Sequence, residues 1–116
     1  MLITRFSVLL VLLITSQLGL ALDDVDQRRR MAGHPMTSID QLWKLSDDPD
    51  WRVRQYLGRN RKSPIDLLDK LASDKHHQVR IAVSTNLGTT TPIFLKLARD
   101  TDTQVRSVVA RFEYVP

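Results

Sequence analysis

An Asp-x-x-x-x-Val-Arg motif occurs three times in this chain, and each copy begins 26 residues after the one before it. The copies span residues 48–54, 74–80 and 100–106, and Leu45, Leu71 and Leu97 recur in the same register. A fixed period of this length is typical of small helical units that stack and bury a shared core. We therefore predict an all-α fold, a helical solenoid of three 26-residue two-helix repeats.

The composition narrows the classes of function. The chain has 116 residues, 42% of them hydrophobic and 26% charged, which is enough for one small globular body. It has no cysteine, which excludes disulfides, thiolate metal sites, iron–sulfur clusters and thiol nucleophiles. The formal net charge of +4 is modest for a basic protein.

Residues 1–21 have the organisation of a secretory signal peptide. Arg5 supplies a positive charge, residues 6–14 are apolar apart from Ser7, and Gly19 and Ala21 offer small side chains for a signal peptidase. We predict cleavage after Ala21 and a periplasmic or secreted location. The alternative is an uncleaved membrane anchor, for which the uncharged stretch 6–22 is at the short limit of ~20 residues. Cleavage removes only one basic residue, so the mature net charge is +3.

The remaining chain divides into a leader and a repeat domain. Residues 22–33 are polar and lack an apolar period, so we predict a flexible leader. Its basic cluster, residues 28–30, is interpreted as a solvated tail, with an anionic surface as the alternative ligand. The repeat domain covers residues 34–116, with units 34–59, 60–85 and 86–111 and a partial cap at 112–116. Phe112, Tyr114 and Val115 are expected to cover the last unit or to pack against a second chain.

Each unit is expected to contain two helices. The first helices are predicted at 38–46, 64–73 and 91–99, and the second helices at 50–59, 76–86 and 103–112. The hydroxyl groups of Thr37, Ser63 and Thr89 are predicted to accept hydrogen bonds at the starts of the first helices. Asp48, Asp74 and Asp100 are predicted to be the N-caps of the second helices.

These residues carry a family resemblance over positions 34–112. The middle unit matches best, through Asn60, Ser63, Pro64, Leu67, Leu68, Leu71, Ala72, Asp74, Val79, Arg80, Ala82 and Val83. The pattern resembles the leucine-rich repeat variant, a bacterial relative of HEAT repeats. The resemblance implies a right-handed stack in which one helix per unit can be a tighter 3₁₀ turn, and it implies little about activity. The first unit departs most, with His34, Ser38 and Ser46 in place of Asn, Pro and Ala.

The recurring acidic and basic residues are the most conspicuous charged set. We call them the Asp/Arg ladder, and its members are Asp48, Arg54, Asp74, Arg80, Asp100 and Arg106. Residues used once per repeat at a fixed register usually build the repeat, so a structural role is favoured over a catalytic one. The guanidinium groups are expected to satisfy backbone carbonyls or the next aspartate.

The positions that do not recur are candidates for partner binding. With Val53 taken as the buried direction, Trp51, Gln55 and Arg59 lie on the opposite side of the same helix. The full candidate set on the second helices is Trp51, Arg52, Gln55, Arg59, His77, Gln78, Ile81 and Arg111. Trp and Arg are the residue types that dominate binding hot spots. The alternative is that Trp51 folds back onto Pro49 or onto the leader.

No motif for chemistry is visible. His76 and His77 are adjacent rather than i, i+4 on a helix, so no metal site is predicted, and neither a cofactor nor enzyme activity is expected. We predict a module that binds a protein or peptide. An inhibitor or immunity-type protein that occludes a periplasmic enzyme, and a surface for an anionic glycan or lipid, are the alternatives. Nucleic acid is disfavoured by export, although a basic cluster lies near Trp51 and Tyr56.

Overall fold

The computed structural model describes residues 24–112, which form seven α-helices and no strand. The helices are α2 (Val25–Gly33), α3 (Ile39–Leu45), α4 (Trp51–Arg59), α5 (Ile65–Leu71), α6 (His77–Ser84), α7 (Thr91–Ala98) and α8 (Thr103–Phe112). The prediction of an all-α fold is confirmed. Within residues 24–112, no helix has the length and apolar character needed to cross a membrane. The predicted signal peptide and residues 113–116 lie outside the described residues.

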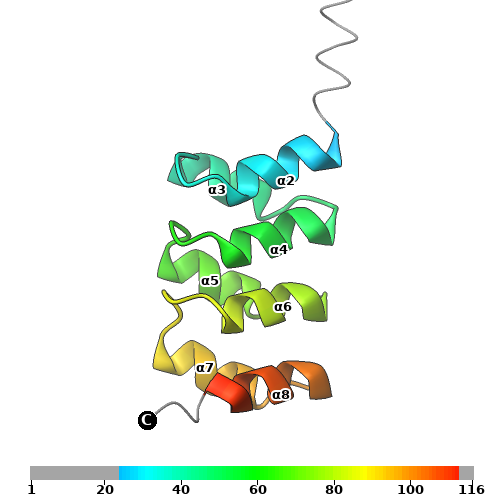
Figure 1. The fold of residues 1–116 in the computed structure, drawn as a ribbon, viewed down its shortest axis with the longest axis vertical. Coiled ribbons are helices and arrows are strands. Elements are labelled where there is room, and N and C mark those ends of the chain that lie inside the picture. Colours follow the sequence, from blue (N-terminus) through cyan, green and yellow to red (C-terminus); the bar gives the residue numbers. More distant parts are fainter. Residues whose placement is uncertain (1–23, 113–116) are drawn as a thin grey trace, which may run out of the picture.

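The helices form two rows that run along the long axis of the molecule, and Figure 1 shows the helices of each row one above the other. The second helices of successive pairs pack side by side in the order α2, α4, α6 and α8. The first helices, α3, α5 and α7, each pack against the second helix of their own pair and against the second helix that precedes them. The main contacts between helices therefore link each helix pair to its immediate neighbours.

The core is an aliphatic layer between the two rows. Its fully buried members are Leu42, Val53, Leu57, Leu67, Leu68, Leu71, Val79, Val83, Leu97 and Val105. Among the recurring leucines, Leu71 and Leu97 are buried, whereas Leu45 is half-buried beside the core. Burying one such side chain contributes about 1.5–3 kcal/mol, so this layer supplies most of the driving force for packing the pairs.

The prediction of a flexible leader is wrong for residues 25–33, because they form helix α2. Asp24 caps this helix by accepting from the backbone N–H of Gln27 at 2.8 Å, and Ala32 is fully buried against the core. α2 packs against α4 and lies in the position of a second helix one period earlier. The sequence of α2 has no apolar period because Gln27 and Arg30 occupy the positions that Val53 and Tyr56 occupy in α4.

The predicted N-caps of the second helices are wrong by two residues. α4 and α6 are capped by Asp50 and His76, whose side chains accept from the amides two residues further on. The aspartates that begin the motif instead form hydrogen bonds in the turn before the second helix. Asp48 and Asp74 each accept from the amide of the capping residue at 2.9 Å.

The predicted role of the three hydroxyl groups is also wrong. Thr37, Ser63 and Thr89 each donate to a backbone carbonyl six residues earlier, at 2.6 Å. They therefore satisfy carbonyls at the ends of the second helices rather than amides at the starts of the first helices. At the start of α3, the cap is Ser38, which forms a capping box with Gln41.

Neighbouring second helices approach closely at one small residue per helix. Ala32, Gly58 and Ser84 are 26 residues apart and all are buried. At Gly58, an added Cβ atom would lie 2.9 Å from the Cβ of Ala82 and 3.3 Å from the backbone nitrogen of Val83. The spacing between α4 and α6 therefore depends on the absence of a side chain at Gly58.

Candidate partner-binding surface

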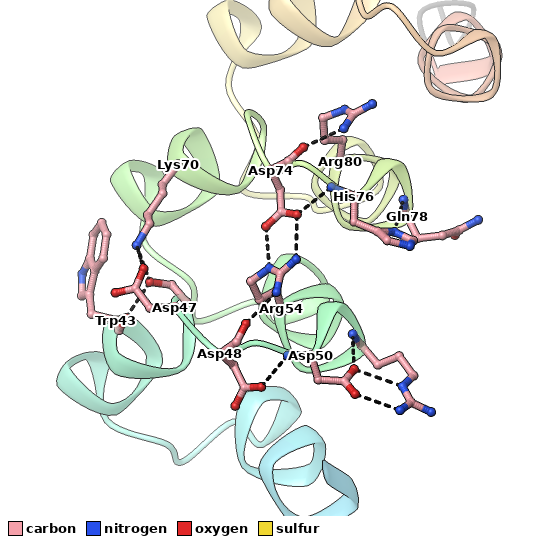
Figure 2. A network of polar contacts seen from close by, with 12 residues as sticks. Trp43, Asp47, Asp48, Asp50, Arg54, Lys70, Asp74, His76, Gln78 and Arg80 are labelled. Carbon is pink, nitrogen blue, oxygen red and sulfur yellow. Dashed lines mark hydrogen bonds and ion pairs between the residues drawn. The ribbon is translucent and has the colours of Figure 1, made fainter.

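The Asp/Arg ladder connects each helix pair to the next. Arg54 on α4 donates from Nε and Nη2 to the two carboxylate oxygens of Asp74, at 2.7 and 3.2 Å, and from Nη1 to the backbone carbonyl of Asp48 at 2.6 Å. Figure 2 shows Arg54 between these two residues. Its side chain is 6% exposed and that of Asp74 is 9% exposed. A buried guanidinium with a bidentate carboxylate is a strong, geometrically specific contact.

The same contact recurs one period later and one period earlier. Arg80 donates from Nε to Asp100 at 2.7 Å and from Nη1 to the carbonyl of Asp74 at 2.6 Å. Arg28 on α2 donates from Nε to Asp48 at 2.7 Å. Arg28 was not assigned to the ladder from the sequence, although it lies 26 residues before Arg54 and its partner aspartate was already identified.

The electrostatics of the ladder follow from this geometry. Burial by itself would raise the pKa of Asp100, but the hydrogen bonds from Arg80 and from the Asp102 amide, with the charges of Arg80 and Arg106, bring it below its ordinary value. Its carboxylate is thus held in the charged, acceptor-only form. Asp74 similarly accepts from Arg54 and from the His76 amide. The ladder carboxylates are engaged in holding the fold.

Two asparagines form a second set of connections between pairs. The amide group of Asn60 donates to the carbonyls of Ala32 and His34 at 2.8 and 3.2 Å, and that of Asn86 donates to Gly58 and Asn60 at 2.7 and 3.0 Å. Both side chains are buried. These bonds satisfy carbonyls at the ends of α2 and α4, so the recurring Asn of the motif is also a structural residue.

The candidate residues that do not recur lie on the second helices, on the side away from buried valines such as Val53. We call this surface the second-helix face. Trp51, Arg52, Gln55 and Arg59 are on α4, whereas His77, Gln78 and Ile81 are on α6. Arg52 and Arg59 are exposed, and the other five are half-buried. Because α4 and α6 are adjacent, the structure brings these seven residues onto neighbouring helices. Arg111 is exposed at the end of α8.

The centre of this face is a stack of three aromatic rings. Trp51 stacks on His76 with a centroid distance of 4.1 Å and an interplanar angle of 4°, and His76 stacks on His77 at 5.0 Å. Trp51 therefore packs against the next helix pair. Nδ1 of His76 accepts from the Gln78 amide at 3.2 Å, which requires an unprotonated Nδ1. Burial, and then the charge of His77, lower the pKa of His76.

Arg52 is held at the edge of this stack by the helix cap. Its Nε and Nη2 donate to the two carboxylate oxygens of Asp50 at 3.0 and 2.8 Å. The hydrogen bond from Arg52 is the main cause that lowers the pKa of Asp50 to about 2. Arg52 is thus orientated by an intramolecular contact and still presents an exposed guanidinium.

The basic cluster near Tyr56 noted in the sequence also includes residues of α2, which was not predicted. The guanidinium carbon of Arg29 lies 5.3 Å from the centroid of the Tyr56 ring, and that of Arg59 lies 5.9 Å from it. Asp26, Arg29, Arg30 and Tyr56 line a depression of about 250 Å³. The basic residues of α2 were interpreted as a solvated tail. Their position next to Tyr56 could have been predicted only if α2 had been recognised as a helix in register with α4.

A polar groove of about 400 Å³ lies on the side of the connections between first and second helices. Lys70 donates to Ser46 and Asp47 at 2.8 and 2.7 Å, and its Nζ lies 5.8 Å from the centroid of the Trp43 ring. Figure 2 shows this contact next to the ladder. Arg54 and Asp74 form part of the lining, and because both are already paired, the groove offers few uncommitted polar groups.

Among residues 24–112, no group of three or more His, Asp or Glu side chains is placed to bind a metal ion. Comparisons with protein-family models, with curated proteins and with solved structures found no match. The functional interpretation therefore depends on the chain's own geometry.

Proposed function

We propose that this chain is an exported, non-enzymatic binding module that recognises a protein or peptide through its second-helix face. In this proposal the helix pairs are 26-residue units of a right-handed solenoid of the leucine-rich repeat variant or HEAT-like kind. α2 would be the second helix of one further unit. A row of second helices presents an extended surface suited to a peptide or to the edge of a protein.

One observation carries the proposal. The side chains that recur every 26 residues are committed to contacts between units, as Arg54 and Asn86 illustrate. The side chains of the second-helix face differ from one helix to the next, and Trp51, Arg59 and Ile81 include hot-spot residue types on adjacent helices. Side chains that differ from one helix to the next, presented on a repeating frame, suit a recognition surface.

The proposal is tested by affinity capture from a periplasmic or secreted fraction. Trp51→Ala/Arg59→Ala should lose a partner that the unaltered protein retains. A matched control, Leu87→Ala/Arg61→Ala, truncates an exposed apolar and an exposed basic residue on the connectors between units. Equal capture by both double variants would refute the role of the second-helix face. If the partner is an enzyme whose activity the chain abolishes, the module is an inhibitor of the immunity type.

A second candidate function is favoured by the cluster around Tyr56. Arg29 and Arg59 lie over the Tyr56 ring and Arg30 lines the same depression, which suits a phosphate or carboxylate of an anionic glycan or lipid. Binding of this kind weakens steeply with salt, whereas an apolar peptide contact does not. Retention on immobilised heparin at 50 mM and 300 mM salt distinguishes the two candidates.

Export is part of the proposal and has its own test. Cleavage after Ala21 would leave Asp24 and the whole of α2 in the mature chain. Mass spectrometry of the protein recovered outside the cytoplasm should therefore give an amino terminus at Leu22. An intact Met1 in a membrane fraction would instead indicate an anchor.

A further inference from the structure

The last described helix carries a ladder arginine that makes one of the three hydrogen bonds found at Arg54 and Arg80. Arg106 on α8 donates from Nη1 to the backbone carbonyl of Asp100 at 2.7 Å. This bond is equivalent to those that orientate Arg54 and Arg80. In those two residues, Nε and Nη2 donate to an aspartate of the following pair. Within residues 24–112, Nε and Nη2 of Arg106 have no such acceptor, and the side chain is exposed.

The surface around Arg106 has the composition of an interface between helix pairs. The equivalent residues one period earlier are Leu68, Ala72 and Ser84, and the following pair buries all three. Their counterparts are Phe94 and Ala98, which are half-buried, and Ala110, which is exposed. Thr91, Phe94, Leu95, Ala98, Val109 and Phe112 line an apolar groove of about 210 Å³ between α7 and α8. We call this surface, together with Arg106, the α7–α8 end face.

The charges of the molecule indicate what fits this face. A guanidinium held by a backbone carbonyl, with two donors directed outward, matches a carboxylate in a bidentate arrangement. Among residues 24–112, the carboxylates of α2 at the opposite end of the stack are already engaged, since Asp26 pairs with Arg29, which disfavours a second copy of the chain. There, α2 presents Gln27 and Arg30 in the positions of Val53 and Tyr56, and the carboxylate of Asp24 already accepts from Gln27. Two end faces meeting about a two-fold axis would bring the Arg106 side chains together, which is unfavourable.

We propose that the α7–α8 end face is a docking site for a helix of a partner protein that has an aspartate in the turn before it. The aspartate pairs with Nε and Nη2 of Arg106, as Asp74 pairs with Arg54, and the apolar side of the helix fills the groove beside Phe94 and Phe112. This site is separate from the second-helix face, so either can fail without the other.

The test uses a peptide with the required chemistry. A synthetic peptide copying residues 60–86 contains a helix and, before it, Asp74, which pairs with Arg54 in the protein. Added to the ¹⁵N-labelled chain, it should shift the amide signals of Ala98, Arg106 and Ala110 in a saturable way. The same peptide with Asp74→Asn should bind about ten-fold more weakly or worse, because the guanidinium loses its counter-charge.

Matched variants of the protein complete the test. Arg106→Gln should weaken binding of the unaltered peptide by about ten-fold and should reduce the difference between the two peptides to less than two-fold. Arg61→Gln, the same change at an exposed arginine on a connector away from α8, should leave binding unchanged. Three results would overturn the proposal: no saturable shift at millimolar peptide, equal binding of both peptides, or the same shifts on raising the protein concentration alone. The last result would show that a second copy covers the face.

Discussion

Removing one carboxylate from the ladder gives the sharpest test of what holds the helix pairs together. Asp74→Asn keeps the shape of the side chain and one oxygen that accepts from the His76 amide. It removes the negative charge that faces Arg54. The change therefore isolates the ion pair from the packing and from the turn.

The expected cost follows from the burial of the pair. The Arg54 side chain is 6% exposed, so its charge cannot be hydrated when the carboxylate is lost. Breaking a buried pair by removing one partner costs about 3–5 kcal/mol. The asparagine oxygen still accepts from Arg54 Nη2, but its NH2 group replaces Oδ2 and faces the Nε–H donor of Arg54, so we expect a loss of at least about 3 kcal/mol. For a domain of this size, that loss lowers the thermal midpoint by about 12–24 °C.

Asp47→Asn is the matched control. Asp47 also pairs with a cation, Lys70 at 2.7 Å, but its side chain is 79% exposed and that of Lys70 is 42% exposed. An exposed pair contributes about 0–1 kcal/mol. Urea unfolding followed by circular dichroism measures both variants. A free-energy loss for Asp74→Asn that exceeds that of Asp47→Asn by less than about 1 kcal/mol would refute the reasoning.

Three further predictions follow from other contacts. Gly58→Ala should destabilise the fold by about 1–3 kcal/mol in urea unfolding, because the added carbon would meet Ala82 at 2.9 Å; a gain in stability would show that the helices can separate without cost. Asn86→Ala should cost about 2 kcal/mol because it leaves buried carbonyls unpaired, and an unchanged midpoint would contradict this. His76 has a lowered pKa, so its neutral form stabilises the fold above about pH 6.5 and this stability is lost as pH falls through the lowered value. His76→Asn keeps a capping side chain and should flatten that dependence of the thermal midpoint, whereas an unchanged slope would exclude His76 as its source.

The sequence period was sufficient to predict the helices from α3 onward and the ladder residues Arg54, Asp74, Arg80 and Asp100 that connect them. The predicted second helix at 103–112 coincides with α8, and the predicted first helix at 64–73 contains α5. A fixed period reports which residues recur because neighbouring units need them. It therefore marks Arg54, Asp74 and the buried valines without any structure.

The errors have two physical origins: residue type does not determine which hydrogen bond a side chain makes, and an apolar period does not register a helix with few buried apolar side chains. Asp48 and Asp50 are two residues apart, and either can cap a helix; the turn geometry assigns the cap to Asp50. Ser63 can accept or donate, and it donates because a buried carbonyl of Leu57 lies within reach. α2 was missed because its burial involves little more than Ala32 and an ion pair, which an apolar period does not register.

The candidate surface could be predicted only in outline. The helical angle placed Trp51 and Gln55 on the side away from Val53. It could not show that Trp51 stacks on His76 of the next pair, nor that Arg29 joins Tyr56, because both contacts depend on how far neighbouring helices are displaced. Such contacts between units depend on tertiary geometry.

The ion pairs of the ladder join residues 20 positions apart, while the pattern itself advances by 26. Each bond thus crosses from one helix pair into its successor. Inserting or deleting a whole unit would leave every arginine facing an aspartate, whereas a gain or loss of another length would disturb the ion pair whose 20-residue spacing contains the change. Lengthening or shortening of this protein is therefore expected to proceed in discrete steps of one unit, with the area available for recognition growing in the same increments.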